Sequence, residues 1–229
     1  MSAPDVIAID GPAASGKSTI GSLLAKRWNY LYFDTGLMYR AVTWLVLERG
    51  LSPLDEKAVS ALAEEIDIDV RNPSEDDGRD YDVLVEGRDI TWKIRAPEVD
   101  AHVSVVAAYP GVREALTVQQ RRIGQRGEVV MVGRDIGTVV LPEADLKIYL
   151  DASVEERATR RYQQRLERGE QVDYQDIVRV MKKRDQIDSS RKVAPLRAAS
   201  DAVVLKTDQL TISEVVDKVA AIAEEVGED

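Results

Sequence analysis

Five short, largely apolar runs are spaced along the chain, with helical patterns between them. These runs occupy residues 6–9, 30–33, 128–132, 146–150 and 202–205. A run that is apolar at nearly every position indicates a strand buried on both faces. Strands that alternate with helices predict a parallel sheet flanked by helices, which is the α/β class of fold.

A second kind of pattern interrupts this series. Residues 66–70 and 81–85 alternate between apolar and polar side chains, and 90–94 follows after Gly87-Arg88-Asp89. Alternation is typical of strands with one face in water, so we expect a small antiparallel sheet whose hairpin turn is Gly87-Arg88-Asp89. The polar stretch 71–80 is expected to be a loop.

The remaining apolar positions recur at helical spacing. They predict helices at 38–49, 55–66, 97–108, 110–123, 153–168, 173–188 and 212–226. We interpret residues 1–229 as a single domain with a core at about 1–36 and 111–229. An insert at about 37–110 carries the small sheet and covers a ligand, and a helical lid lies at about 153–172.

The first turn of the predicted sheet has the clearest chemistry. Gly11-Pro12-Ala13-Ala14-Ser15-Gly16-Lys17-Ser18 fits the pattern G-x-x-x-x-G-K-[ST], between a predicted strand and a helix bearing Ile20 and Leu24. In such a P loop, backbone N–H groups and the helix dipole cradle phosphates. Lys17 would reach the β- and γ-phosphates, and the Ser18 hydroxyl would bind Mg²⁺. The sequence therefore predicts a nucleoside-triphosphate site.

Composition narrows the class of ligand. The 229 residues have a formal net charge of −10, which argues against nonspecific binding to nucleic acid or anionic membranes. The chain has no cysteine, so disulfides and Cys-ligated metals are excluded. We expect a cytoplasmic protein, since no basic leader and no apolar window of about 20 residues is present. The arginines concentrate in 151–200, which suggests that they bind a small anion.

Two arginine-bearing patterns follow in that stretch. Arg157, Arg161, Arg165 and Arg168 lie on one stripe of a predicted helix. They indicate either a lid that closes on the triphosphate or a solvated face with mixed charges. Arg184, Asp188 and Arg191 also share a helix face, either as a structural ion-pair ladder or as a clamp for phosphate and sugar hydroxyls.

These features favour phosphoryl transfer to a small acceptor. A GTPase switch needs an N/TKxD element that reads guanine and a DxxG element, and the chain has neither. The nearest string, Lys206-Thr207-Asp208, has the wrong order. Transfer to an alcohol benefits from a base, for which Asp34 is a candidate, although Asp34 could instead assist Mg²⁺ through water. A phosphate monoester needs no base, since its second pKa of about 6 leaves it ionised at neutral pH. Four arginines suit such an anionic acceptor better than an alcohol, namely Arg40, Arg134, Arg184 and Arg191.

The chain resembles the bacterial cytidylate (CMP) kinases over nearly its whole length. The matching motifs are Ile9-Asp10-Gly11-Pro12 through Lys17-Ser18; Asp34-Thr35-Gly36-Leu37-Met38-Tyr39-Arg40; Val112-Arg113-Glu114-Ala115-Leu116; Gly133-Arg134-Asp135-Ile136-Gly137-Thr138-Val139-Val140; Lys147-Ile148-Tyr149-Leu150-Asp151-Ala152; and Arg184-Asp185 through Asp188-Ser189-Ser190-Arg191 with Ala194-Pro195-Leu196. The resemblance implies a nucleoside-monophosphate kinase that converts ATP and CMP or dCMP into ADP and CDP or dCDP, with Mg²⁺ as cofactor.

The resemblance also implies roles for individual residues. ATP would lie on Gly11, Pro12, Ala13, Ala14, Ser15, Gly16, Lys17, Ser18 and Thr19. The CMP phosphate would be bound by Arg40, Arg134 and Arg191, the cytosine by Ser104, Arg113 and Asp135, and the sugar region by Thr35, Tyr39, Arg184 and Asp188. Catalysis would rest on Lys17, Arg134, Arg157, Arg161 and Arg191, without a covalent nucleophile. His102, the only histidine, is given no role.

Two rival functions stay open at this point. One is a kinase of another acceptor, such as shikimate or AMP. The other is a regulatory module that closes on ATP and contacts a protein partner without turnover. We expect a monomer that acts on small molecules and binds neither nucleic acid nor membrane.

Overall fold

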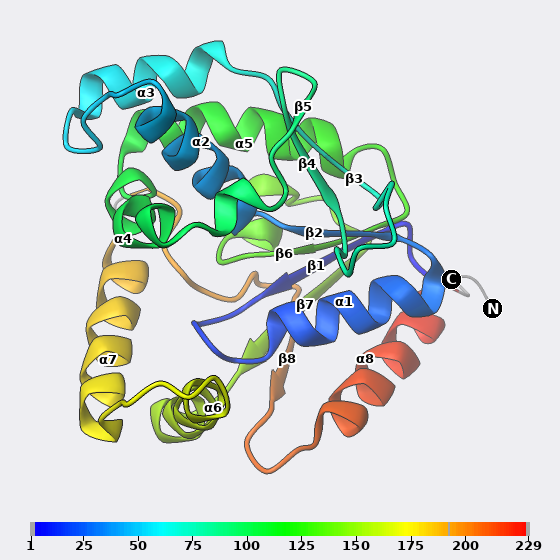
Figure 1. The fold of residues 1–229 in the computed structure, drawn as a ribbon. Helices are drawn as coiled ribbons and strands as arrows, with labels where there is room; N and C mark the ends of the chain where they lie inside the picture. Colours follow the sequence, from blue (N-terminus) through cyan, green and yellow to red (C-terminus); the bar gives the residue numbers. More distant parts are fainter. Residues whose placement is uncertain (1–2, 192, 228–229) are drawn as a thin grey trace.

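The computed structural model describes residues 3–191 and 193–227, which form a central parallel sheet with helices around it (Figure 1). The strands of this sheet are β1 (Val6–Asp10), β2 (Leu31–Asp34), β6 (Val129–Val132), β7 (Leu146–Asp151) and β8 (Val203–Lys206). They lie in the order β2-β6-β1-β7-β8, and every neighbouring pair is parallel. The predicted α/β fold with a five-stranded parallel sheet is therefore confirmed. The expectation that every strand is buried on both faces is wrong for β8, because it lies at the edge of the sheet and leaves Val203 and Val204 exposed.

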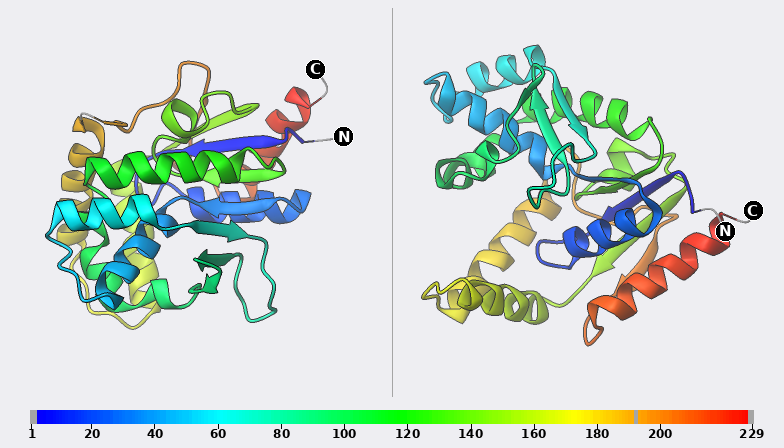
Figure 2. Two further views of the ribbon diagram at one scale, coloured as in Figure 1. Left: turned by 90° about the horizontal axis from the view of Figure 1, so that it is seen from above. Right: turned by 45° about the vertical axis from the view of Figure 1, so that its right-hand side comes forward.

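Helices cover both faces of this sheet. On one face, α1 (Lys17–Trp28) packs against α8 (Ile212–Val226), whose start is fixed by a capping box between Thr211 and Glu214. A single π-helical turn, η2 (Ile136–Val140), lies over the opposite face, and α5 (Pro110–Gly124) packs on it (Figure 2). Because all the strands are parallel, their carboxyl ends gather at one edge, which is where ligands bind in open α/β sheets.

A second group of elements lies beside that edge. Its helices are α2 (Gly36–Glu48), α3 (Glu56–Glu65), η1 (Lys93–Arg95, a 3₁₀ turn) and α4 (Pro97–Val106), and its antiparallel sheet is β3 (Ile68–Arg71), β4 (Asp82–Val85) and β5 (Arg88–Asp89). The main hydrophobic core continues without a break from Phe33 through Met38 to Ile68. This continuous core holds the small sheet firmly against the parallel one. The boundaries of the insert and lid stay a prediction.

The prediction of a strand at 90–94 is wrong. The hairpin turns at Glu86 and Gly87, which both have positive φ, and Arg88 and Asp89 pair with β4 as a two-residue strand. The strand ends there because side chains take over its hydrogen bonds. The Asp89 carboxylate accepts from the backbone and hydroxyl of Thr91, and the Thr91 hydroxyl accepts from the Val83 backbone N–H at 2.9 Å.

Two further helices stand apart from the main core, at the lower left of Figure 1. These are α6 (Val154–Glu167), capped by Ser153, and α7 (Tyr174–Ser190), capped by Asp173. They pack on each other around a small cluster of their own, which includes Ala158, Ile177 and Met181. Across the described ranges, every helix is too short or too polar to cross a membrane.

Candidate active site

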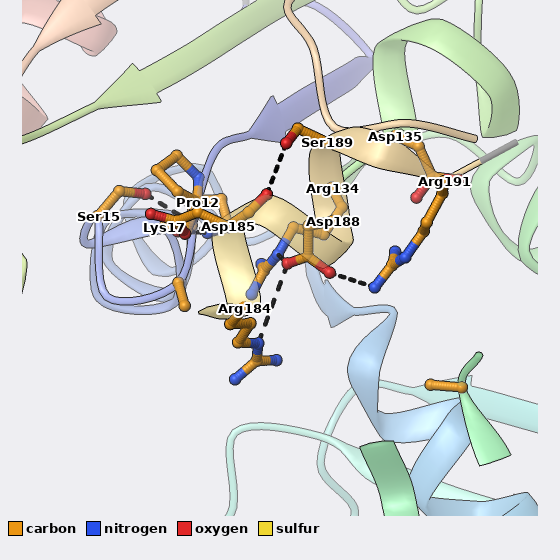
Figure 3. Close-up of polar contacts among 12 residues, drawn as sticks. Pro12, Ser15, Lys17, Arg134, Asp135, Arg184, Asp185, Asp188, Ser189 and Arg191 are labelled. Carbon is orange, nitrogen blue, oxygen red and sulfur yellow. Dashed lines mark hydrogen bonds and ion pairs between the residues drawn. The ribbon is translucent and has the colours of Figure 1, made fainter. Parts of the chain in front are cut away.

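The loop between β1 and α1 has the backbone that its glycines predict. Gly11 has φ +149°, and a Cβ there would come within 2.2 Å of the Leu150 carbonyl oxygen. Gly16 has φ +100° at the start of α1. Lys17 is buried, and its ammonium group donates to the Pro12 carbonyl at 2.6 Å (Figure 3). Burial, followed by the nearby charge of Arg134, lowers the Lys17 pKa well below its usual value.

A cavity of about 490 Å³ opens on one side of this loop. Six of the nine predicted ATP residues line it, namely Ala14, Ser15, Gly16, Lys17, Ser18 and Thr19. Its other walls are α6 with Arg160 and Arg161, the loop after β8 with Thr207, and α8 with Val215. Gly11, Pro12 and Ala13 are not among its lining residues. We call this space the donor cavity.

A second cavity, of about 570 Å³, lies on the other side of the loop, and we call it the acceptor cavity. It brings together all ten residues predicted to bind CMP: Thr35, Tyr39, Arg40, Ser104, Arg113, Arg134, Asp135, Arg184, Asp188 and Arg191. Lys17, Ser18, Ala14 and Arg161 line both cavities. The two spaces therefore meet at the lysine and hydroxyl of the P loop.

Asp188 is the centre of an arginine cluster in the acceptor cavity (Figure 3). This buried carboxylate accepts from Arg134 Nε at 3.0 Å and from Arg191, and Arg184 Nε lies 3.9 Å away. Three guanidinium groups face one carboxylate, so positive charge remains for an anion. Burial, with the nearby charge of Arg134, lowers the pKa of Arg184, which shows how closely these cations crowd.

A buried ion pair forms another wall of the acceptor cavity. Arg113 Nη2 on α5 donates to Asp135 Oδ2 at 2.9 Å, and less than a tenth of either side chain is exposed. The Arg113 guanidinium lies 5.5 Å from the centre of the Tyr39 ring. Burial raises the pKa of Asp135, although Arg113 opposes the shift. Among residues 3–191 and 193–227, Arg113 Nε finds no partner, so hydrogen-bonding capacity is left at this wall.

Arg40 lies at the outer rim of the same cavity. Its guanidinium donates to the Ile94 carbonyl at 2.9 Å and pairs with Asp100 on α4. Ser104, one turn further along α4, also lines the cavity. Residues from the small-sheet region thus reach the same space as Arg134 and Arg191.

The arginines predicted to lie on one stripe of α6 have two kinds of surroundings, since Arg161 is at the cavities and Arg157 is buried away from them. Arg161 lines both cavities and donates to Gln164 at 2.9 Å, while Arg165 pairs with Glu170 at 2.6 Å. Arg157 is only 3% exposed and lines neither cavity. Its partners are the backbone carbonyls of Ala13 and Ala152 and the carboxylate of Asp185. Its predicted role on the triphosphate stays a prediction.

Two aspartates hold the loops that surround the P loop. Asp34 accepts from the Ser18 hydroxyl at 3.1 Å and from the Gly36 backbone N–H at 2.9 Å. Asp10, next to Gly11, accepts from the backbone N–H groups of Ile136 and Gly137, each at 2.8 Å. Burial raises the pKa of Asp10 to about 6, against the lowering effect of these hydrogen bonds.

Three of these carboxylates were not singled out from the sequence. Asp10 and Asp185 lie inside motifs quoted above, but a sequence pattern does not tell which partners a buried carboxylate finds. Asp100 pairs with Arg40 across 60 positions, and no local spacing signals that contact.

Comparison with known proteins gives the family. The family described as "Cytidylate kinase" matches residues 7–225. The "Cytidylate kinase" of Roseiflexus castenholzii is 52% identical over 222 residues, which cover 96% of this chain and 94% of the relative. Those of Chloroflexus aggregans and Bacillus licheniformis are 51% and 46% identical, covering 94% and 95% of this chain and 92% and 95% of the relatives.

The fold recurs in solved structures as well. An uncharacterized protein from Eubacterium ventriosum superposes with a TM-score of 0.51 at 11% identity, covering 96% of this chain and 98% of that one. The match shows a shared fold alone. The family match over nearly the whole length, together with relatives at about half identity, shows that this chain belongs to the cytidylate kinase family.

Proposed function

We propose that this protein transfers the γ-phosphoryl group of ATP to CMP or dCMP, giving ADP and CDP or dCDP. The observation that carries this proposal is the pair of cavities that share Lys17, Ser18 and Arg161. The names of the relatives support CMP as the acceptor. ATP would occupy the donor cavity and the monophosphate the acceptor cavity, with their phosphates meeting at Lys17.

We assign the acceptor contacts by the chemistry of each wall. Arg40, Arg134 and Arg191 offer guanidinium groups to the monophosphate, because planar guanidinium binds phosphate oxygens in pairs. Asp135 would accept from the exocyclic amine of cytosine, and Arg113 would donate to its ring carbonyl, with Ser104 beside them. Thr35, Tyr39, Arg184 and Asp188 would meet the sugar region.

The proposed chemistry is direct in-line attack by an oxygen of the monophosphate. No general base is required, because a phosphate monoester with a second pKa of about 6 is already ionised at neutral pH. The task of the protein is to hold two anions together and to neutralise the charge that spreads in the transition state. We assign that task to Lys17, Arg134, Arg161 and Arg191. Arg157, whose guanidinium binds the Ala152 and Ala13 carbonyls, would serve the transfer as a lid residue without contacting a phosphate.

Mg²⁺ fits the oxygen donors beside the P loop. The Ser18 hydroxyl and the Asp34 carboxylate lie 3.1 Å apart, and hard oxygen ligands of this kind suit Mg²⁺. Within residues 3–191 and 193–227, no group of three or more His, Cys, Asp or Glu side chains could hold a metal by itself. Ser18, with Asp34 directly or through water, would therefore hold Mg²⁺ together with the phosphates of ATP. The ion would supply neutralisation of the β- and γ-phosphate charge.

A coupled assay of ADP release tests this function. Purified protein with ATP and Mg²⁺ would be offered CMP, dCMP, UMP, AMP and shikimate in parallel, with product identity checked by chromatography. We expect fastest turnover with CMP or dCMP. A strong preference for AMP or shikimate would contradict the proposal, and ATP binding without turnover on any acceptor would favour a regulatory module. The monomeric state and cytoplasmic location stay predictions, the first testable by light scattering.

A further inference from the structure

Four of the five N–H donors of Arg157 have partners within the protein. Its Nε donates to the Ala152 carbonyl at 3.0 Å, and its Nη1 donates to the Ala13 carbonyl at 3.1 Å. Nη1 and Nη2 also reach the two oxygens of Asp185, at 3.2 and 2.6 Å. A buried arginine whose donors already meet two carbonyls and a carboxylate does not need a ligand to satisfy it.

These bonds join three segments that surround the substrates. Ala13 belongs to the P loop, Ala152 follows the last residue of β7, and Asp185 lies on α7. Ala14, which follows Ala13, has φ +62°, a conformation that costs free energy for a residue with a Cβ. Fixing the Ala13 carbonyl therefore helps to hold the P loop in a shape that it would not keep by itself.

Helix α7 carries a second carboxylate that binds arginine, one turn from Asp185. Asp185 and Asp188 are three residues apart and so share a face of the helix. Asp185 binds Arg157 and through it the P loop, while Asp188 binds Arg134 and Arg191 of the acceptor cavity. The same helix is thus connected to both substrate sites.

The connection from α7 through Arg157 to the P loop is important because α6 and α7 pack little against the main core. The cluster between α6 and α7 is small and separate from the main core, so apolar packing against the core contributes little to their placement. The bond from Arg157 to the Ala13 carbonyl joins α6 directly to the P loop, and the bond from Arg157 to Asp185 joins α6 to α7. A change of about 1 Å in the alignment of two reacting groups can reduce a rate about 100-fold.

We propose that Arg157 and Asp185 form a positioning pair that holds the P loop and α7 in register, so that the donor and acceptor phosphates line up. In this proposal Asp185 acts only through Arg157, and Arg157 acts through the Ala13 carbonyl. Neither side chain contacts a phosphate. Arg161, one turn along α6, is the arginine that reaches the triphosphate. The proposal rests on the proposed function for its catalytic consequence, but not for its structural part.

The test compares Arg157→Gln, Asp185→Asn and the double variant with the wild type. We expect each single variant to reduce kcat about 10- to 100-fold, with KM for CMP changed less than about threefold, since the acceptor-cavity arginines are untouched. The double variant should be no worse than either single one, because both substitutions break one connection. The matched control is Arg179→Gln on α7, where an exposed pair with Asp176 makes no contact with either cavity.

A loss of activity in Arg157→Gln with none in Asp185→Asn would overturn the proposal, because Arg157 would then contact the phosphates directly. Losses that multiply in the double variant would also overturn it. Amide hydrogen exchange gives a readout that needs no turnover. In Asp185→Asn without nucleotide, the amides of residues 13–16 should exchange at least about tenfold faster than in the wild type, and unchanged protection would overturn the structural part. If the wild type failed to phosphorylate CMP, the exchange experiment would still show whether the Arg157–Asp185 pair holds the P loop. Failure of the proposed function and failure of the positioning pair are therefore distinguishable.

Discussion

Replacing Asp135 by asparagine changes what the buried wall of the acceptor cavity can donate and accept. The Asp135 carboxylate offers acceptors only, one of which is used by Arg113 Nη2 at 2.9 Å. An amide of nearly the same shape adds an N–H donor. Cytosine presents an exocyclic amine, which needs an acceptor, whereas uracil presents a carbonyl at the same position, which needs a donor. The substitution should therefore turn the preference of the site from CMP toward UMP.

The size of the effect follows from the burial of the pair. Less than a tenth of each side chain is exposed, so water cannot replace a lost partner. A hydrogen bond to a charged group contributes about 1.5–3 kcal/mol, which corresponds to roughly a 10- to 150-fold loss in kcat/KM for CMP. The Arg113 bond to the remaining amide oxygen limits the damage to the fold, so a cooperative thermal transition should persist.

The assay is steady-state turnover of CMP and UMP by the wild type and by Asp135→Asn, with the ratio of the two kcat/KM values as the result. Asp176→Asn, an exposed position on α7, controls for loss of a negative charge. We expect the CMP-to-UMP ratio to fall at least about tenfold in Asp135→Asn and to stay constant in the control. A ratio that does not change while overall activity falls would refute base recognition by Asp135.

Three other outcomes follow from the site. Lys17→Ala should lower kcat at least about 100-fold, because Lys17 neutralises transition-state charge, while CMP should still bind in an equilibrium titration. Unchanged turnover would remove the P loop from the mechanism. Arg40→Ala should raise KM for CMP about 10- to 100-fold. Asp100→Ala removes only the half-exposed partner of Arg40 and should change this KM less than about fivefold. Equal effects of the two variants on KM would count against a contact between Arg40 and the CMP phosphate. The folded pKa of Asp10, about 6, lies above its ordinary value, so the folded state binds a proton that the unfolded state lacks between about pH 4 and 6. The unfolding free energy of the wild type relative to Asp10→Asn should therefore fall by ~3 kcal/mol as the pH rises through that window, measured by urea denaturation, and a rise would refute the argument.

Strand composition explains why most of the fold could be predicted from the sequence. Runs such as 129–132 are apolar on both faces, and a covered parallel sheet accommodates several of them. The strand predicted at 90–94 fails for a local reason, because the Asp89 and Thr91 side chains supply the hydrogen bonds that a longer strand would have made. A pattern of apolar and polar positions does not contain that information.

The site was predictable to the extent that motifs carry it. The residues predicted to bind CMP do line one cavity, although they come from segments as distant as Thr35 and Arg191. Helical spacing placed Arg157 and Arg161 on the same face, but it could not distinguish them. The distinction depends on Asp185, which lies 28 positions after Arg157 and meets it only once α6 and α7 pack together.

The most direct test of the central claim is a crystal structure of the complex with CMP and a non-hydrolysable ATP analogue. Two anions should occupy one cleft on either side of Lys17. We expect the CMP phosphate between Arg40, Arg134 and Arg191, with one of its oxygens about 3–3.5 Å from the γ-phosphorus. A CMP phosphate bound elsewhere, with these three arginines turned away from Lys17, would contradict it.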